Sequence, residues 1–239
     1  MAEAPQLVVN GLEVGYGRAA SVVRDVSLTL GQGQEAVILG ANGAGKSTLL
    51  LAIAGLLPSR AGRVTLNGED ISSASPHERV RLGLVLGLEG HRVVNELSVE
   101  DNLRLALYSL GGRWSRREVK ERVERSLGRF EILGKYRKRM AGTMSGGEQQ
   151  MLVMARLFIT DASVLLVDEP SLGLSPLIID RVYQMLRDAR REGKTTVVVE
   201  QSANDVLQSS DSSFVLRNSR LERFDASASR EDLARAYLG

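Results

Sequence analysis

The chain has 239 residues, of which 43% are hydrophobic, and this length favours one large α/β domain with a full hydrophobic core. Its 31 basic and 29 acidic residues leave a formal charge of +2, so no overall field directs it to nucleic acid or to a membrane surface. The absence of cysteine excludes a disulfide framework and thiolate metal sites, and it fits a reducing compartment.

The N-terminal residues, MAEAPQLVV, lack the basic and apolar regions of a secretion signal. The most apolar helical stretch, Leu49–Leu57, is about half of the roughly 20 residues that a membrane-spanning helix needs. We therefore expect a cytoplasmic protein that meets a membrane only through other subunits.

The first part of the chain predicts a β-layer followed by a nucleotide-binding unit. Apolar and polar residues alternate through Leu7 and Val9 and again from Val26 to Leu30, which indicates two antiparallel strands. Next come a short buried strand at Glu35–Leu39, a glycine-rich turn, and a helical pattern at Lys46–Leu56.

Further strands are expected at Arg63–Leu66 and Leu84–Leu88, before a helical insertion begins. Residues 113–139 hold eleven Arg or Lys and four Asp or Glu, with Val119, Val123, Leu127 and Phe130 at helical spacing. This pattern is typical of a solvated amphipathic helix that docks by one stripe, and contact with acidic lipid headgroups or a partner loop is the alternative.

The remainder of the chain alternates helix and strand, which indicates a parallel sheet. A helix is expected from Ser145 to about Ile159, and an apolar strand at Val164–Val167 has the character of a sheet covered on both faces. Ser175 and Pro176 predict the capped start of the next helix, Gly193 its end, and Thr195–Val199 a strand of β-branched residues.

The segment Gly40-Ala-Asn-Gly-Ala-Gly-Lys-Ser47 matches the phosphate-binding loop and lies between a predicted strand and a predicted helix, as that loop requires. Its glycines allow backbone amides to surround phosphate oxygens, Lys46 can reach the β- and γ-phosphates, and the Ser47 hydroxyl can bind Mg²⁺. A purely structural glycine turn would leave the Lys-Ser pair without a role.

Two carboxylates follow the apolar strand at Val164–Val167, at the sheet edge where open α/β folds bind ligands. We expect Asp168 to hold Mg²⁺ through its water shell and Glu169 to polarise the attacking water as general base. In isolation, both could instead cap the start of a helix.

The segment Met144-Ser-Gly-Gly-Glu-Gln149 is the most diagnostic of the chain. Ser145 and Glu148 have the spacing of a helix capping box. The glycines Gly146 and Gly147 expose amides at the positive end of the helix dipole, where a γ-phosphate could bind. Because the phosphate loop already serves this chain's own nucleotide, this second anion site is better used by another subunit.

These three segments, in this order and spacing, resemble the ABC ATPase family across nearly the whole chain. The resemblance implies a RecA-like parallel-sheet core (residues 1–88 and 155–239), an N-terminal antiparallel β-layer and an inserted α-helical subdomain that carries the signature segment (about 89–154). It also implies that Tyr16 stacks on adenine, that residues 171–174 contact the other subunit of a dimer, and that Ser145, Gly146, Gly147 and Glu148 bind the partner's ATP. The expected nucleotide-binding residues of the chain's own site are Tyr16, Gly40, Ala41, Asn42, Gly43, Ala44, Gly45, Lys46, Ser47 and Thr48.

Finer features are similar to the second ATP-binding subunit of branched-chain amino acid importers: residues 146–151, 169–177 and 199–201, and the ending Ala236-Tyr-Leu-Gly239. Urea and amide importers share parts of this pattern. Glu89 stands where ABC ATPases usually have a glutamine that senses Mg²⁺ and the permease, and Gln201 stands where a histidine usually meets the γ-phosphate. Leu88, Val94 and Met144 depart from the subgroup itself, so the solute stays open.

The resemblance implies ATP and Mg²⁺ as ligands, with Lys46, Glu169 and Gln201 as catalytic residues and Ser47, Glu89 and Asp168 at the metal. It further implies a homodimer or a heterodimer with a second ABC ATPase, two membrane permease subunits and an extracytoplasmic solute-binding protein as partners, and no nucleic acid. The expected location of the chain is the cytoplasmic face of the inner membrane. One alternative is a nucleotide-gated subunit that hydrolyses poorly, against which Glu169 argues. A soluble ABC protein of translation or DNA repair would call for a second cassette or a long coiled coil, and a kinase would have no use for the signature segment.

Overall fold

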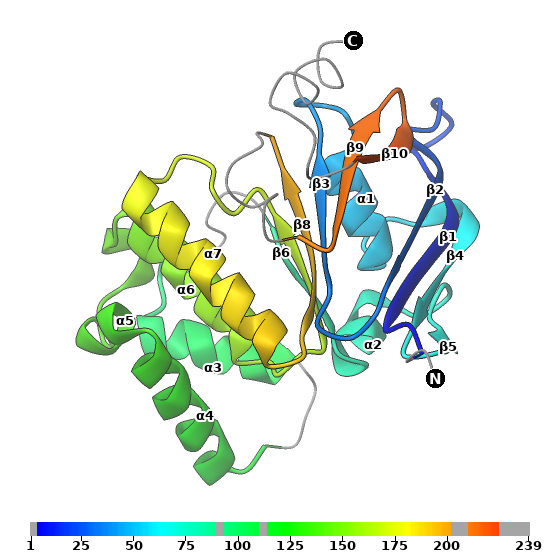
Figure 1. Cartoon of the computed structure of the whole chain (residues 1–239). Coiled ribbons are helices and arrows are strands. Elements are labelled where there is room, and N and C mark those ends of the chain that lie inside the picture. Colours follow the sequence, from blue (N-terminus) through cyan, green and yellow to red (C-terminus); the bar gives the residue numbers. More distant parts are fainter. Residues whose placement is uncertain (1–3, 89–92, 110–113, 202–209, 225–239) are drawn as a thin grey trace.

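The computed structural model describes residues 4–88, 93–109, 114–201 and 210–224 of the chain. In these residues two sheets and seven α-helices form a layered α/β structure (Figure 1). The smaller sheet is antiparallel and has the order β2-β1-β4-β5. Its strands are β1 (Leu7–Val14), β2 (Val23–Leu30), β4 (Ser59–Leu66) and β5 (Glu69–Asp70).

The larger sheet has the order β10-β9-β3-β8-β7-β6, and its strands run parallel except for β10. Its strands are β3 (Glu35–Leu39), β6 (Leu84–Gly87), β7 (Val164–Asp168), β8 (Thr195–Glu200), β9 (Ser212–Arg217) and β10 (Arg220–Phe224). Every residue of β3, β7 and β8 is buried, as expected of strands that are covered on both faces of the sheet.

The helices divide between the two faces of this sheet. In Figure 1, α1 lies between the two sheets, whereas α6 and α7 cover the opposite face, next to α3, α4 and α5. The helices are α1 (Lys46–Ile53), α2 (Pro76–Arg81), α3 (Val99–Ser109), α4 (Arg116–Arg129), α5 (Glu131–Lys135), α6 (Gly146–Phe158) and α7 (Pro176–Arg191), and a 3₁₀ turn at Ala141–Thr143 precedes α6.

The alternation of side chains along the strands builds two hydrophobic cores. One face of β8, with Val197 and Val199, packs with α1 and the antiparallel sheet, while Val198 on the other face packs with the helices from α3 to α7. The cores fix α1 and α6 on opposite faces of one sheet, and the loops that follow β3, β7 and β8 meet at its carboxyl edge.

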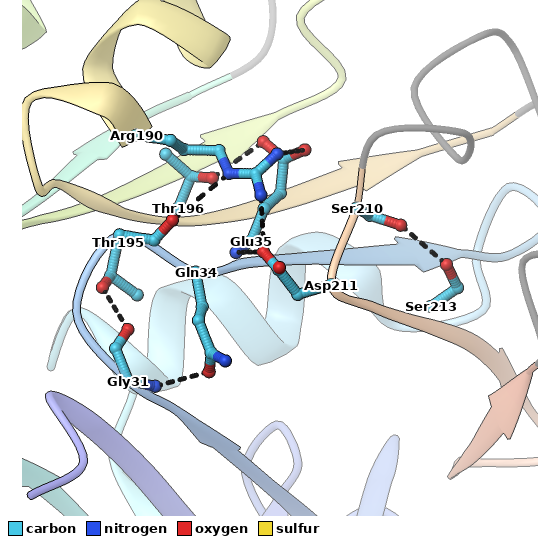
Figure 2. Close-up of polar contacts among 10 residues, drawn as sticks. Gly31, Gln34, Glu35, Arg190, Thr195, Thr196, Ser210, Asp211 and Ser213 are labelled. Carbon is cyan, nitrogen blue, oxygen red and sulfur yellow. Dashed lines mark hydrogen bonds and ion pairs between the residues drawn. The ribbon is translucent and has the colours of Figure 1, made fainter. Parts of the chain in front are cut away.

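The amino edge of the same sheet is closed by a polar network (Figure 2). Arg190 of α7 pairs with Asp211 (2.6 Å) and with the buried Glu35 (3.4 Å), whose other carboxylate oxygen accepts a hydrogen bond from Thr196 (2.8 Å). This network joins the starts of β3, β8 and β9 to the end of α7.

The expected fold class is confirmed, with some shifts in element bounds. Helix α1 ends at Ile53 rather than at Leu56, because Gly55 takes a left-handed conformation (φ 76°) that turns the chain. Strand β4 begins at Ser59, four residues before the predicted start at Arg63. Strand β6 ends at Gly87, one residue before the predicted end at Leu88. Ser175 occupies the N-cap of α7, but its side chain makes no capping hydrogen bond, so the expectation of a side-chain cap was wrong.

The amphipathic stripe predicted for residues 113–139 is confirmed, since Val119, Val123, Leu127 and Phe130 are all buried. The division into a core and a helical subdomain stays a prediction, and its boundary at residue 154 falls inside the continuous helix α6. Within the described ranges, no helix has the length and apolar character needed to cross a membrane.

Candidate functional site

The loop between β3 and α1 has the backbone shape of a phosphate cradle. Gly43 and Gly45 adopt left-handed conformations (φ 79° and 105°), which turn the chain back on itself before α1 begins at Lys46. A Cβ atom at Gly45 would lie 2.9 Å from Val22 Cγ1, so a larger residue does not fit there. The amides at the start of α1 have no acceptor within the helix and are free to bind an anion.

Lys46 is the cation of this loop, and only 4% of its surface is exposed. Its Nζ atom donates to the carbonyl oxygens of Gly40 (2.7 Å) and Ala41 (3.3 Å) and pairs with Glu169 Oε1 at 3.0 Å. The pair brings together two residues that are far apart in the sequence, and it holds the lysine with a counter-ion that phosphate oxygens can replace.

The end of β7 supplies both predicted carboxylates. Asp168 Oδ1 accepts a hydrogen bond from the Ser47 hydroxyl (3.2 Å), which places two of the three expected metal-binding residues side by side. Glu169 has a left-handed backbone (φ 43°), and its amide donates to Val199 O of β8 (2.9 Å). This conformation is strained for a residue with a side chain, and such strain gathers at functional sites.

These groups line a cleft of about 510 Å³ at the carboxyl edge of the sheet. Its lining residues are Tyr16, Val22, Asn42, Gly43, Gly45, Lys46, Ser47, Thr48, Glu169, Leu172 and Gln201. A neighbouring hollow shares Asn42 and Gly43 with the cleft and is lined by Gly40, Ala41 and Ala44 as well. The cleft therefore unites residues from the loops after β1, β3, β7 and β8.

Tyr16 lies at one side of the cleft, with 51% of its surface exposed. Its hydroxyl group is 3.1 Å from Thr48 Oγ1, so one hydrogen bond joins the predicted adenine contact to α1. Arg60 of β4 donates to Gly17 O (2.8 Å) and to the Ser21 hydroxyl (3.0 Å), and thereby fixes the turn that carries Tyr16. An exposed aromatic ring beside a phosphate loop is suited to stacking on a nucleobase.

The site fits a nucleotide with a divalent cation. Mg²⁺ prefers oxygen ligands and usually takes one or two carboxylates together with substrate phosphates, and the adjacent Ser47 and Asp168 oxygens agree with this donor set. Among the described residues, no group of three or more His, Cys, Asp or Glu side chains could hold a metal by itself. Glu89, the third expected metal ligand, lies outside the described residues.

The signature segment forms the predicted capping box at the start of α6. Ser145 N donates to Glu148 Oε2 (2.8 Å), and Glu148 N donates to Ser145 Oγ (3.4 Å). A Cβ atom at Gly147 would lie 3.2 Å from Ile178 of α7, so this glycine also permits close packing of two helices. Residues 145–148 are absent from the described lining of the cleft, so in a single chain the signature and the phosphate loop are separate sites.

Several residues of the site were not predicted from the sequence. Val22 and Leu172 line the cleft as plain apolar side chains, and Arg60 reaches the Tyr16 turn from another strand. Val22 and Arg60 belong to no motif, because their roles depend on the pairing of β1 with β4. Only the position of Leu172 in the predicted dimer loop gave a sequence signal.

Comparison with known proteins agrees with this geometry. Residues 23–172 match the ABC transporter family. The high-affinity branched-chain amino acid transport ATP-binding protein BraG of Pseudomonas aeruginosa is 36% identical over 228 residues, which cover 94% of this chain and 95% of BraG. A probable branched-chain amino acid transport ATP-binding protein, LivF of Archaeoglobus fulgidus, is 37% identical over 211 residues, or 88% of this chain and 87% of LivF.

Among solved structures, the ADP conformation of MJ1267, an ATP-binding cassette of an ABC transporter, superposes with a TM-score of 0.83 at 26% identity. The superposition covers 99% of this chain and all of that cassette. The phosphate loop, the paired carboxylates, the signature helix and these similarities together lead to one conclusion: the chain belongs to the ABC transporter family, as one of its ATP-binding ATPases.

Proposed function

We propose that this chain is the ATP-hydrolysing subunit of an ABC importer for branched-chain amino acids. The observation that carries the proposal is the meeting of Lys46, Ser47 and Glu169 in one cleft, where Ser47 is hydrogen-bonded to Asp168, 121 positions further along the chain. The solute is inferred from BraG and LivF, whose names specify branched-chain amino acid transport and which match almost the whole chain.

The phosphate loop would bind the triphosphate through its amides and through Lys46. In this role Lys46 exchanges Glu169 for phosphate oxygens, while it keeps the carbonyls of Gly40 and Ala41 as anchors. Ser47 and Asp168 would hold Mg²⁺, which supplies positive charge against the phosphate oxygens when it is bound. Tyr16 would stack on the adenine ring.

The exchange at Lys46 has a consequence for Glu169. Once Lys46 turns to phosphate, the Glu169 carboxylate is free to accept a proton from water within the cleft. Gln201 lines the same cleft and can donate an amide hydrogen bond to a phosphate oxygen, but it cannot carry a proton near neutral pH. We therefore assign proton transfer to Glu169 and orientation to Gln201.

The signature segment would complete the nucleotide site of a second subunit. Residues 145–148 form the N-terminus of α6 and are not among the described lining of the chain's own cleft, and Leu172, in the loop after Glu169, is an exposed apolar residue. Two such surfaces facing each other can enclose nucleotide between a phosphate loop and a signature helix. The partner would be a second copy of this chain or a related ATPase.

Association with membrane permease components follows from the importer role. In the proposed assembly, two ATPase subunits lie beneath two permease subunits at the cytoplasmic face of the inner membrane. An extracytoplasmic binding protein then delivers the solute to the permease.

The direct test is Mg²⁺-dependent ATP hydrolysis by the purified chain, alone and with its permease. Lys46→Ala removes the cation of the phosphate loop, so we expect hydrolysis to be abolished and ATP affinity to fall roughly tenfold or more. Lys120→Ala, which removes an exposed lysine of α4, is the matched control and should leave both unchanged. Undiminished hydrolysis by the Lys46 variant would contradict the site assignment.

A further inference from the structure

A further buried carboxyl group, that of Glu200, lies at the end of β8, next in the chain to Gln201 of the cleft. Only 2% of its surface is exposed. Because side chains alternate along a strand, Glu200 faces α7 together with Val198, whereas Gln201 is directed to the opposite side and lines the cleft. The side chains of Glu200 and Gln201, which are adjacent in the chain, therefore lie on opposite sides of the sheet.

Donors from two segments, the loop after β7 and helix α7, converge on the Glu200 carboxyl group. Its Oε1 atom accepts hydrogen bonds from the Ser171 amide (3.1 Å) and from the Tyr183 hydroxyl group of α7 (2.6 Å). Burial raises the pKa of Glu200, and the donors from Tyr183 and Ser171 oppose that rise.

The contacts of Glu200 and its neighbour Val199 link several parts of the site. Ser171 is two residues from Glu169, in the loop that also carries Leu172. The backbone of β8 adds two further links, since Val199 O accepts from the Glu169 amide (2.9 Å) and Glu200 O accepts from the Gly40 amide (3.3 Å). The residue pair 199–200 therefore joins the start of the phosphate loop, the general base and Gln201.

The helix that carries the signature segment reaches the same loop. Gln150 Nε2 of α6 donates to Pro170 O at 3.3 Å, between Glu169 and Ser171. The loop is thus hydrogen-bonded both to the Glu200 side chain and to α6. A change in the position of α6 relative to β8 would be transmitted to Glu169 through these two contacts.

We propose that Glu200 is a positioning residue for hydrolysis, one that fixes Ser171 and Gln201 so that the side chains of Glu169 and Gln201 face the same point in the cleft. This role rests on the proposed ATPase function and adds to it a residue that does not itself touch the nucleotide. Since the phosphate loop and Tyr16 make none of the side-chain contacts of Glu200, its loss should affect turnover rather than ATP binding.

Glu200→Gln tests this role, because it keeps the shape of the side chain but places an amide group against donors. We expect turnover at saturating ATP to fall roughly tenfold or more, which corresponds to losing one charge-assisted hydrogen bond. ATP affinity, measured by calorimetry without hydrolysis, should stay within about twofold of the parent. A merely structural defect would not separate the two quantities in this way.

Glu35→Gln is the matched control. Glu35 is also 2% exposed, begins a neighbouring parallel strand, and has a pKa that burial raises. It lies at the opposite edge of the sheet, in the network of Figure 2, with Thr196 and Arg190 as partners. We expect Glu35→Gln to lower the unfolding temperature while leaving turnover unchanged in the folded protein.

Tyr183→Phe provides a second variant that should fold even if Glu200→Gln does not. It removes one donor and leaves the hydrogen bond from the Ser171 amide to Glu200, so we expect a severalfold fall in turnover with unaltered ATP affinity. Unchanged turnover in both variants, or an equal loss in Glu35→Gln, would overturn the positioning role. A parent protein that hydrolyses no ATP, alone or with its permease, would instead refute the proposed function itself.

Discussion

At the residue scale, the most informative contact is the buried ion pair between Lys46 and Glu169. The pair places the proposed cation for the phosphates and the proposed base for water at 3.0 Å from each other. Breaking a buried pair leaves an uncompensated charge, so the pair is stable only until another anion replaces the carboxylate. In the proposed mechanism, ATP binding and release of the Glu169 carboxylate are therefore coupled through one lysine.

The role of Gln201 distinguishes an active ATPase from a subunit that binds nucleotide but hydrolyses it poorly. If it orients phosphate and water while Glu169 is the base, Gln201→Ala should lower turnover by one charge-assisted hydrogen bond, which is about 1.5–3 kcal/mol or roughly ten- to a hundredfold. Steady-state hydrolysis at saturating ATP measures this. Activity equal to the parent would place Gln201 outside the reaction.

Much of the site at this scale could be predicted from sequence, because the phosphate loop and the two carboxylates are local patterns with a known chemistry. Glu200 and Arg60 could not. Each works through partners on other elements, Tyr183 and Ser171 in one case and the Tyr16 turn in the other, and nothing in the neighbouring sequence specifies those contacts.

At the scale of elements, hydrophobic spacing identified the buried strands and the stripe of α4 well. It failed where a strand has little apolar character. Residues Ser59–Arg63 of β4 are exposed, and the strand extends through them because they pair with β1, as at Glu13 with Ala61. Pairing of this kind is a tertiary property that the pattern of one strand does not contain.

The helices of the 99–140 region are joined by a charge network with a predictable pH dependence. Arg137 donates to both carboxylate oxygens of Glu100 (2.6 and 3.1 Å) and pairs with Glu124 of α4 (2.7 Å). These hydrogen bonds lower the pKa of Glu100 below its usual range. A lowered pKa in the folded state stabilises the fold above the unfolded pKa, and this contribution is lost as the pH falls through the folded value.

We therefore expect Glu100→Gln to lower the free energy of unfolding by about 1 kcal/mol at pH 7, at the upper end for partly exposed pairs. The difference from the parent should shrink as the pH falls below about 4, where the unfolded carboxyl group takes up a proton while the folded one is still ionised, and it should vanish once the folded group is protonated as well. Denaturant titrations at several pH values measure this. Glu131→Gln is a control on α5, and a pH-independent difference for Glu100→Gln would argue against the ion pair as its cause.

At the scale of the whole molecule, the sheet separates two functions. Its carboxyl edge gathers the nucleotide cleft, its amino edge is closed by the Arg190 network of Figure 2, and the signature helix lies on the face opposite α1. One chain thus presents a phosphate loop and a signature segment as separate surfaces. From the sequence, this separation was predicted only because one chain needs one phosphate site for its own nucleotide. In the fold, the signature segment is absent from the described lining of the cleft that holds the phosphate loop.

The central claim is that two such chains enclose ATP and that Glu169 then activates water. Glu169→Gln tests both parts, because it should retain nucleotide binding, free Lys46 from its competing carboxylate and stop hydrolysis. Light scattering after gel filtration of this variant with saturating ATP and Mg²⁺ is the most direct measurement. We expect a stable dimer that disappears when ATP is removed; a variant that stays monomeric, both alone and together with its partner ATPase, would rule out nucleotide enclosure between two chains.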